Sequence, residues 1–159
     1  MQKLISIPQK KLKLFESEDH YIIDNVLENL LNEEVNALFL QANVCLDNED
    51  FSESIKFYDL ILKIDSNNIL ALIDKGTTLQ ILGRIKLAIR CFDKALEINP
   101  EDEFVLECKA GALAMKGIQL ATSKKFEEAE ECFDDVLKIN PEDETILESK
   151  ADVLSSLGK

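Results

Sequence analysis

Tryptophan is absent from this 159-residue chain, histidine occurs once, and aromatic residues make up only 6% of it. Five glycines and three prolines are also few, so the sequence holds few residues that interrupt helices. No stretch approaches the roughly 20 consecutive apolar residues that a membrane-spanning helix needs. Because 46% of the residues are hydrophobic, the chain can still bury the core of one domain, and these shortages favour helices over sheet.

The residue patterns of common catalytic and metal sites are missing as well. Cys45, Cys91, Cys108 and Cys132 form no C-x-x-C pair, and the single His20 lies far from all of them. Zinc needs ligands clustered at characteristic spacings, and the sequence contains no Gly-rich phosphate loop and no recognisable nucleophile–base arrangement. We therefore expect no catalytic residues, no cofactor and no metal, and reduced cysteines that act as small hydrophobic residues.

The charge balance restricts the choice of partners. The net charge is -13, from 31 acidic and 18 basic residues, so the average surface repels nucleic acids and anionic lipids. Residues 1–15 are basic but lack the hydrophobic core of a secretory signal. We therefore expect a cytoplasmic protein whose direct partners include neither nucleic acid nor a membrane.

Comparing the chain with itself reveals a repeat. Residues 88–102 read AIRCFDKALEINPED and residues 129–143 read AEECFDDVLKINPED, an offset of 41, and residues 54–68 form a looser copy 34 residues before the first. Each copy places a small residue, an aromatic residue four positions on, and an aliphatic residue or Ala three further on. That spacing is one stripe of an amphipathic helix, and the stretches between the copies carry a complementary stripe. Each unit is therefore predicted to be a helical hairpin.

A 34-residue helix-turn-helix unit with these small, aromatic, Ala and Pro positions resembles the tetratricopeptide repeat. Residues 35–68 and 69–102 fit directly, and the second unit has family-typical residues at Gly76, Phe92 and Pro100. The resemblance implies an all-α fold, a right-handed superhelical stack of antiparallel helix hairpins. It also implies a non-catalytic protein–protein interaction module.

The third unit, residues 103–143, is seven residues too long. Aligning residues 109–110 with 75–76 assigns the surplus to residues 118–125. Seven residues are close to two helical turns, so an added stretch of that length keeps the apolar stripe in register. We expect a first helix that runs from residue 103 to about residue 123, in preference to a disordered insert.

The two ends of the chain depart from the repeat. Residues 144–159 repeat only the first helix of a unit, as a terminal cap or as part of a longer array. Residues 1–34 do not match the repeat, and we assign them to an amino-terminal tail and a capping helix over residues 20–32, before a repeat domain at 35–159.

In the family that the chain resembles, first helices line the concave face and bind ligands. The resemblance transfers partner binding to Phe39, Leu40, Asn43, Asp47, Leu70, Ile73, Asp74, Thr77, Phe104, Glu107 and Cys108. None of these is Lys or Arg, whereas family members that bind chaperone tails use Lys, Asn and Arg on this face. Of the positions that matter, Thr77, Phe104 and Cys108 hold other residue types, so that ligand is disfavoured.

An apolar floor with acidic residues suits a protein or peptide partner with a basic and apolar segment. The same apolar side chains are also compatible with simple packing between neighbouring helices. We therefore expect a scaffold or assembly adaptor. The alternative is a self-associating structural protein, a homo-oligomer that stacks through its terminal helix.

Overall fold

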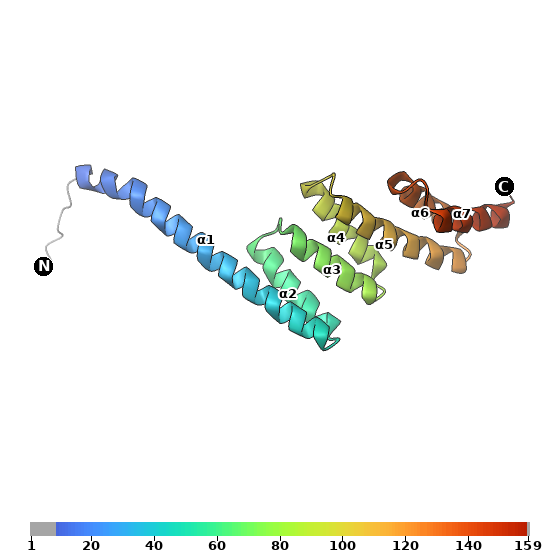
Figure 1. The fold of residues 1–159 in the computed structure, drawn as a ribbon, viewed down its shortest axis with the longest axis horizontal. Coiled ribbons are helices and arrows are strands. Elements are labelled where there is room, and N and C mark those ends of the chain that lie inside the picture. Colours follow the sequence, from blue (N-terminus) through green and yellow to red (C-terminus); the bar gives the residue numbers. More distant parts are fainter. Residues whose placement is uncertain (1–8, 159) are drawn as a thin grey trace, which may run out of the picture. The chain divides into compact units, whose positions relative to one another are not determined.

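A computed structural model describes the backbone of residues 9–158 and the side chains of residues 24–158. The first eight residues of the predicted tail therefore lie outside the described part. Helices and turns make up this described part, which contains no strand. The helices are α1 (Gln9–Asp47), α2 (Phe51–Ile64), α3 (Ile69–Ile81), α4 (Ile85–Ile98), α5 (Glu103–Thr122), α6 (Phe126–Ile139) and α7 (Glu144–Leu157) (Figure 1). The predicted all-α stack of helical hairpins is confirmed.

The chain divides into two compact units, residues 1–37 and residues 38–159. In the first unit, α1 passes without interruption through residue 34, where the sequence suggested a boundary. No Gly or Pro occurs between residues 9 and 47, so nothing local ends the helix there. Side chains 24–34 are all exposed, and the capping role of residues 20–32 stays a prediction.

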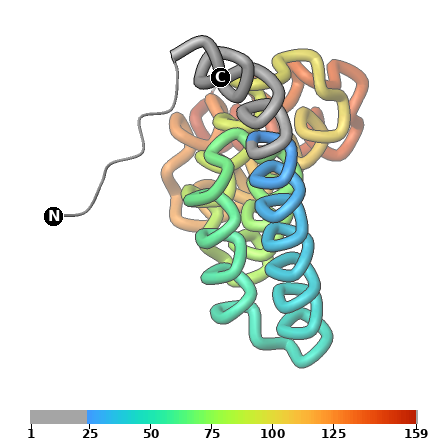
Figure 2. Tube along the Cα trace, turned by 90° about the vertical axis from the view of Figure 1, so that its left-hand side faces the viewer, coloured from blue at the N-terminus to red at the C-terminus, as the bar shows by residue number. Residues whose placement is uncertain are grey.

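The second unit contains the hairpins, and Figure 2 shows α2 returning antiparallel beside the last turns of α1. The first helices of later hairpins begin at equivalent capped positions. Asn68, Asp102 and Asp143 each accept a hydrogen bond from the backbone N–H three residues on, at 3.0, 3.1 and 3.1 Å. Such side-chain caps satisfy N–H groups that have no partner within the helix, so the start of each of these three helices is determined locally.

The turns between first and second helices also repeat. The middle residue of the turn is Glu49, Gly83 or Lys124, with φ of 60°, 70° and 60°. Only Gly adopts this left-handed conformation without steric cost, so two of the three turns hold a strained residue. Gly158 follows α7 with the same conformation, at φ 71°.

The cores of the second and third hairpins depend on a glycine in the first helix that packs against an aromatic ring from the second. A methyl group at Gly76 would lie 2.6 Å from Cε1 of Phe92, and one at Gly117 would lie 2.6 Å from Cε1 of Phe133. Both rings are almost fully buried. Close approach of the two helices therefore requires glycine at both positions.

The contact between Gly117 and Phe133 corrects the alignment of the third unit. Gly117, not Ala110, corresponds to Gly76, so residues 110–143 form the 34-residue unit and the surplus is 103–109 instead of 118–125. Helix α5 has 20 residues against 13 in α3, which confirms the predicted extension. Both alignments preserve the apolar stripe because they differ by about two turns, so the stripe does not choose between them.

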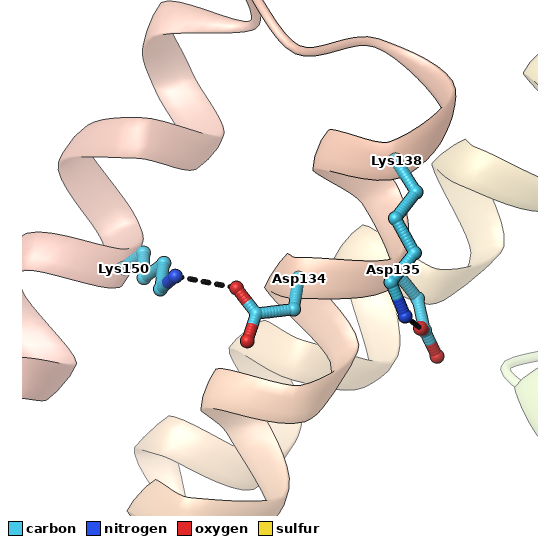
Figure 3. A network of polar contacts seen from close by, with 4 residues as sticks. All are labelled: Asp134, Asp135, Lys138 and Lys150. Atoms are coloured by element: carbon cyan, nitrogen blue, oxygen red, sulfur yellow. Dashed lines mark hydrogen bonds and ion pairs between the residues drawn. The ribbon is translucent and has the colours of Figure 1, made fainter.

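The amino-terminal part of α5 keeps the register of the preceding units. An Asp of each second helix pairs with a Lys of the next first helix: Asp59 with Lys75 at 2.5 Å, Asp93 with Lys109 at 2.7 Å, and Asp134 with Lys150 (Figure 3). Lys109 is 34 residues after Lys75, as in a regular array. Helix α5 thus keeps the 34-residue spacing where Lys109 pairs with Asp93 of α4. Where Gly117 packs against Phe133 of α6, the spacing from the preceding unit is 41 residues.

Candidate functional site

The first helices form one face of the second unit. Helix α3 contacts α5, and α5 contacts α7, while Nε2 of Gln80 on α3 lies 3.1 Å from Sδ of Met115 on α5. Exposed apolar side chains lie at equivalent positions 34 residues apart on α3 and α5. Leu70 and Phe104 are 65% and 59% exposed, and Ile81 is 59% exposed at the position equivalent to Met115. We call this surface the inner helix face.

A polar recess of about 140 Å³ opens between the first two hairpins of the unit. Its lining is Asn43, Leu46, Tyr58, Asp74, Thr77, Thr78 and Ile81. Three residues predicted from the sequence, Asn43, Asp74 and Thr77, therefore come together from α1 and α3. Tyr58 was missed because the sequence argument considered only first helices, whereas this residue reaches the recess from α2.

The recess holds two polar groups without partners. Asp74 is half-buried, forms no ion pair with any described residue, and burial raises the pKa of its carboxyl. The buried hydroxyl of Tyr58 likewise has no hydrogen-bond partner of acceptable geometry in the described chain. Burial, and secondarily the charge of Asp74, raises the pKa of this phenol, while the nearby hydroxyls of Ser54 and Thr78 oppose the rise. Unpartnered buried polar groups are uncommon and call for a partner.

The other predicted residues divide by exposure. Leu40 is 61% exposed, and Asp47 and Glu107 are exposed as well. In contrast, Ile73 is 7% exposed within the core, and the ring of Phe39 is half-buried, with its centroid 6.2 Å from that of Tyr58. These two side chains therefore pack beneath the inner helix face and expose little of their surface. Partner binding by the whole predicted set stays a prediction.

Cys108 is half-buried, and burial, followed by the charges of Glu107 and Asp102, raises the pKa of its thiol. The thiol is therefore protonated near neutral pH and a poor nucleophile. All four cysteines are free. Among the described residues, no group of three or more His, Cys, Asp or Glu side chains could hold a metal ion, and no helix there is long and apolar enough to cross a membrane.

Comparison with known families assigns the chain. Tetratricopeptide repeat models match residues 35–68, 69–102 and 110–143. These segments cover more than half of the chain, which therefore belongs to the tetratricopeptide repeat family. The third match begins at residue 110, in agreement with the register that the Gly117–Phe133 contact requires.

Individual relatives are similar over part of the chain. Superkiller protein 3 of Saccharomyces cerevisiae is 31% identical over 72 residues, which is 45% of this chain but 5% of that protein. The amino-terminal domain of stress-induced protein-1 from C. elegans has a TM-score of 0.58 at 17% identity, with 77% of this chain and 96% of that one covered. The second tetratricopeptide repeat domain of human RPAP3, in complex with an HSP70 peptide, has a TM-score of 0.55 at 14% identity. The match covers 77% of this chain and 97% of that one.

Proposed function

We propose that this chain is a non-catalytic protein-interaction module that binds a basic and apolar segment of a partner on its inner helix face, as a scaffold or assembly adaptor. The observation that carries the proposal is Asp74, a half-buried carboxylate with no ion-pair partner in the described chain. A buried charge is costly unless it is paired, so a Lys or Arg of a ligand would remove that cost.

The surroundings of Asp74 supply the apolar part of the interaction. Leu70 and Ile81, on the same helix, expose 65% and 59% of their surface, and each would be covered by an apolar side chain beside the ligand's basic group. The RPAP3 domain is in complex with an HSP70 peptide, SGPTIEEVD, that ends in acidic residues. Here the inner helix face offers Asp47, Asp74 and Glu107, so charge complementarity favours a basic ligand.

A direct test is fluorescence anisotropy with a labelled Leu-Lys-Leu-Arg-Leu peptide. We expect Asp74→Asn to weaken binding about tenfold, since it removes one charge-assisted hydrogen bond. The control Glu142→Gln removes one negative charge from an exposed turn distant in sequence and should change affinity less than about twofold. Equal affinities for Asp74→Asn and the wild-type chain would contradict the proposal.

The raised pKa of Asp74 gives the same test a pH dependence. Burial favours the protonated form in the folded chain, so lowering the pH through this raised pKa stabilises the fold and removes the negative charge that the ligand needs. For the wild-type chain, peptide affinity should therefore decrease as the pH is lowered through that window. Asp74→Asn should show no such fall, and a fall of equal size in the variant would exclude Asp74 as its cause.

Self-association through the terminal helix is a second proposal. Leu147 of α7 is 45% exposed, whereas Leu72, at the same repeat position in α3, is 3% exposed beneath α4. An apolar position that other hairpins bury is thus open in α7. Light scattering that finds a monomer at all concentrations would exclude this alternative.

A further inference from the structure

A second groove, of about 370 Å³, lies among the second helices α2 and α4 and the first helix α3 between them. Its lining is Ile55, Asp59, Leu62, Leu72, Lys75, Leu79, Arg84, Leu87, Arg90, Cys91 and Lys94. None of these belongs to the inner helix face. We call it the α2–α4 groove.

Cations gather at this groove although the chain as a whole carries a net charge of -13. The sequence contains two arginines, Arg84 and Arg90, and both line the groove. Neither forms an ion pair with a described residue, and the same holds for Lys94, whereas Lys75 pairs with Asp59. The groove therefore presents three exposed cations without a counter-charge and one that is already satisfied.

Three of the four cations lie near Cys91. Leu87, Arg90, Cys91 and Lys94 occur at helical spacings of three and four and so share one side of α4. Burial raises the pKa of the Cys91 thiol, and the positive charges of Lys75, Lys94 and Arg90 oppose that rise. Side chains from two helices thus act on one buried atom.

The floor of the groove is apolar. Leu72 and Leu79 are 3% exposed, and Leu62 is half-buried beside them. At the rim, Leu87 exposes 44% of its surface. The groove therefore combines an apolar floor with separated cations, an arrangement in which apolar contacts give affinity and a few charges give specificity.

The next unit shows that packing does not require this basic rim. The buried residues are the same 41 positions later, where Cys132 and Phe133 correspond to Cys91 and Phe92. The exposed positions are reversed in charge: Glu131 and Asp135 stand where Arg90 and Lys94 stand on α4. The core therefore does not require the basic rim, whereas an acidic ligand would be attracted by it.

We propose that the α2–α4 groove binds an acidic segment of a partner protein, in which an apolar side chain between two carboxylates enters the floor. The guanidinium groups of Arg84 and Arg90 can each hold a carboxylate through two parallel hydrogen bonds. Lys94 adds a third positive charge one turn beyond Arg90. A long nucleic acid is a poorer occupant, because its phosphates would extend beyond the groove over the predominantly acidic surface.

The experiment uses the full chain and a labelled, acetylated Asp-Glu-Leu-Leu-Glu-Asp peptide, with binding followed by anisotropy. Arg90→Glu/Lys94→Glu should weaken binding by about tenfold or more. The matched control Lys124→Glu/Lys125→Glu makes the same change in net charge at the exposed α5–α6 turn and should weaken it less than about threefold. All four substituted side chains are exposed, so circular dichroism should show unchanged helix content.

Three results would overturn the proposal. Equal binding of Asn-Gln-Leu-Leu-Gln-Asn would show that the carboxylates are not recognised. Equal losses in the two double variants would show a dependence on net charge alone. A wild-type oligomer that Arg90→Glu/Lys94→Glu converts to monomer, without measurable peptide binding, would identify a second copy as the occupant. Asp74→Asn should leave binding of the acidic peptide intact, so this test fails or succeeds independently of the inner helix face.

Discussion

Helices α4 and α6 are built on one frame but carry opposite surface charge. In each, a buried phenylalanine packs against a glycine of the preceding helix. A methyl group added at either glycine would lie 2.6 Å from Cε1 of the ring. Yet α4 has three basic and two acidic residues, and α6 has one basic and six acidic residues. Buried positions are restricted by close packing, whereas exposed positions are free to differ. The two hairpins therefore share a fold but present different surface charge.

The largest expected effect tests whether the two cores are equivalent. Gly76→Ala and Gly117→Ala each bring a methyl group within 2.6 Å of a buried ring, so the ring or the helix has to shift. We expect each to lower the free energy of unfolding by about 1–3 kcal/mol, measured by urea denaturation.

Gly111→Ala is the matched control, because its new methyl group meets only Nε2 of Gln80, at 3.8 Å. The better helix propensity of Ala should make this variant neutral or stabilising by up to about 1 kcal/mol. A loss at Gly76 without one at Gly117 would show that the two cores are not equivalent.

A smaller effect separates the turns of the two hairpins. Lys124 has φ 60° where Gly83 has φ 70°, so the same turn is strained in one hairpin and relaxed in the other. Lys124→Gly should raise stability by about 0.5–1 kcal/mol, and Gly83→Ala should lower it by about 1 kcal/mol. Thermal unfolding midpoints measure both, and shifts of the same sign would contradict a shared turn conformation.

The smallest effect concerns the ion pairs that link successive units. Asp93 and Asp134 are each 44% exposed, so neither pair should contribute more than about 1 kcal/mol. Asp134→Asn should cost less than Asp93→Asn, because Asp134 lies among other acidic residues on α6 and its removal relieves repulsion. Urea denaturation at low and high salt measures the loss of unfolding free energy in each variant. A difference between the two losses that persists at high salt would not be electrostatic.

Most of the helical architecture could be predicted because its signals are local. Apolar stripes of helical period and capping residues such as Asp102 act within a few residues of themselves. The length of α5 was predictable for the same reason. The stripe did not determine its register: the alignments that equate Gly76 with Ala110 or with Gly117 differ by two turns and leave the same stripe. The contact of Gly117 with Phe133 and the family match at residues 110–143 distinguish them.

The candidate sites were only partly predictable. Asn43, Asp74 and Thr77 were identified by position within the repeat, and they do line one recess. Exposure differed among residues that the same rule selected, since Ile73 is buried and Leu70 is open. The neighbour contacts that decide burial come from other helices, and the pattern of a single helix does not contain them.

From its sequence alone this protein is determined to be a tetratricopeptide-type stack of amphipathic helices, because period, caps and turns are properties of neighbouring residues. Tertiary structure decided how closely Gly76 and Gly117 approach the rings, and how Arg84 and Arg90 meet Lys75 of another helix in one groove. Such contacts join residues that are far apart along the chain. They depend on how helices pack in space, which no local pattern of residues specifies.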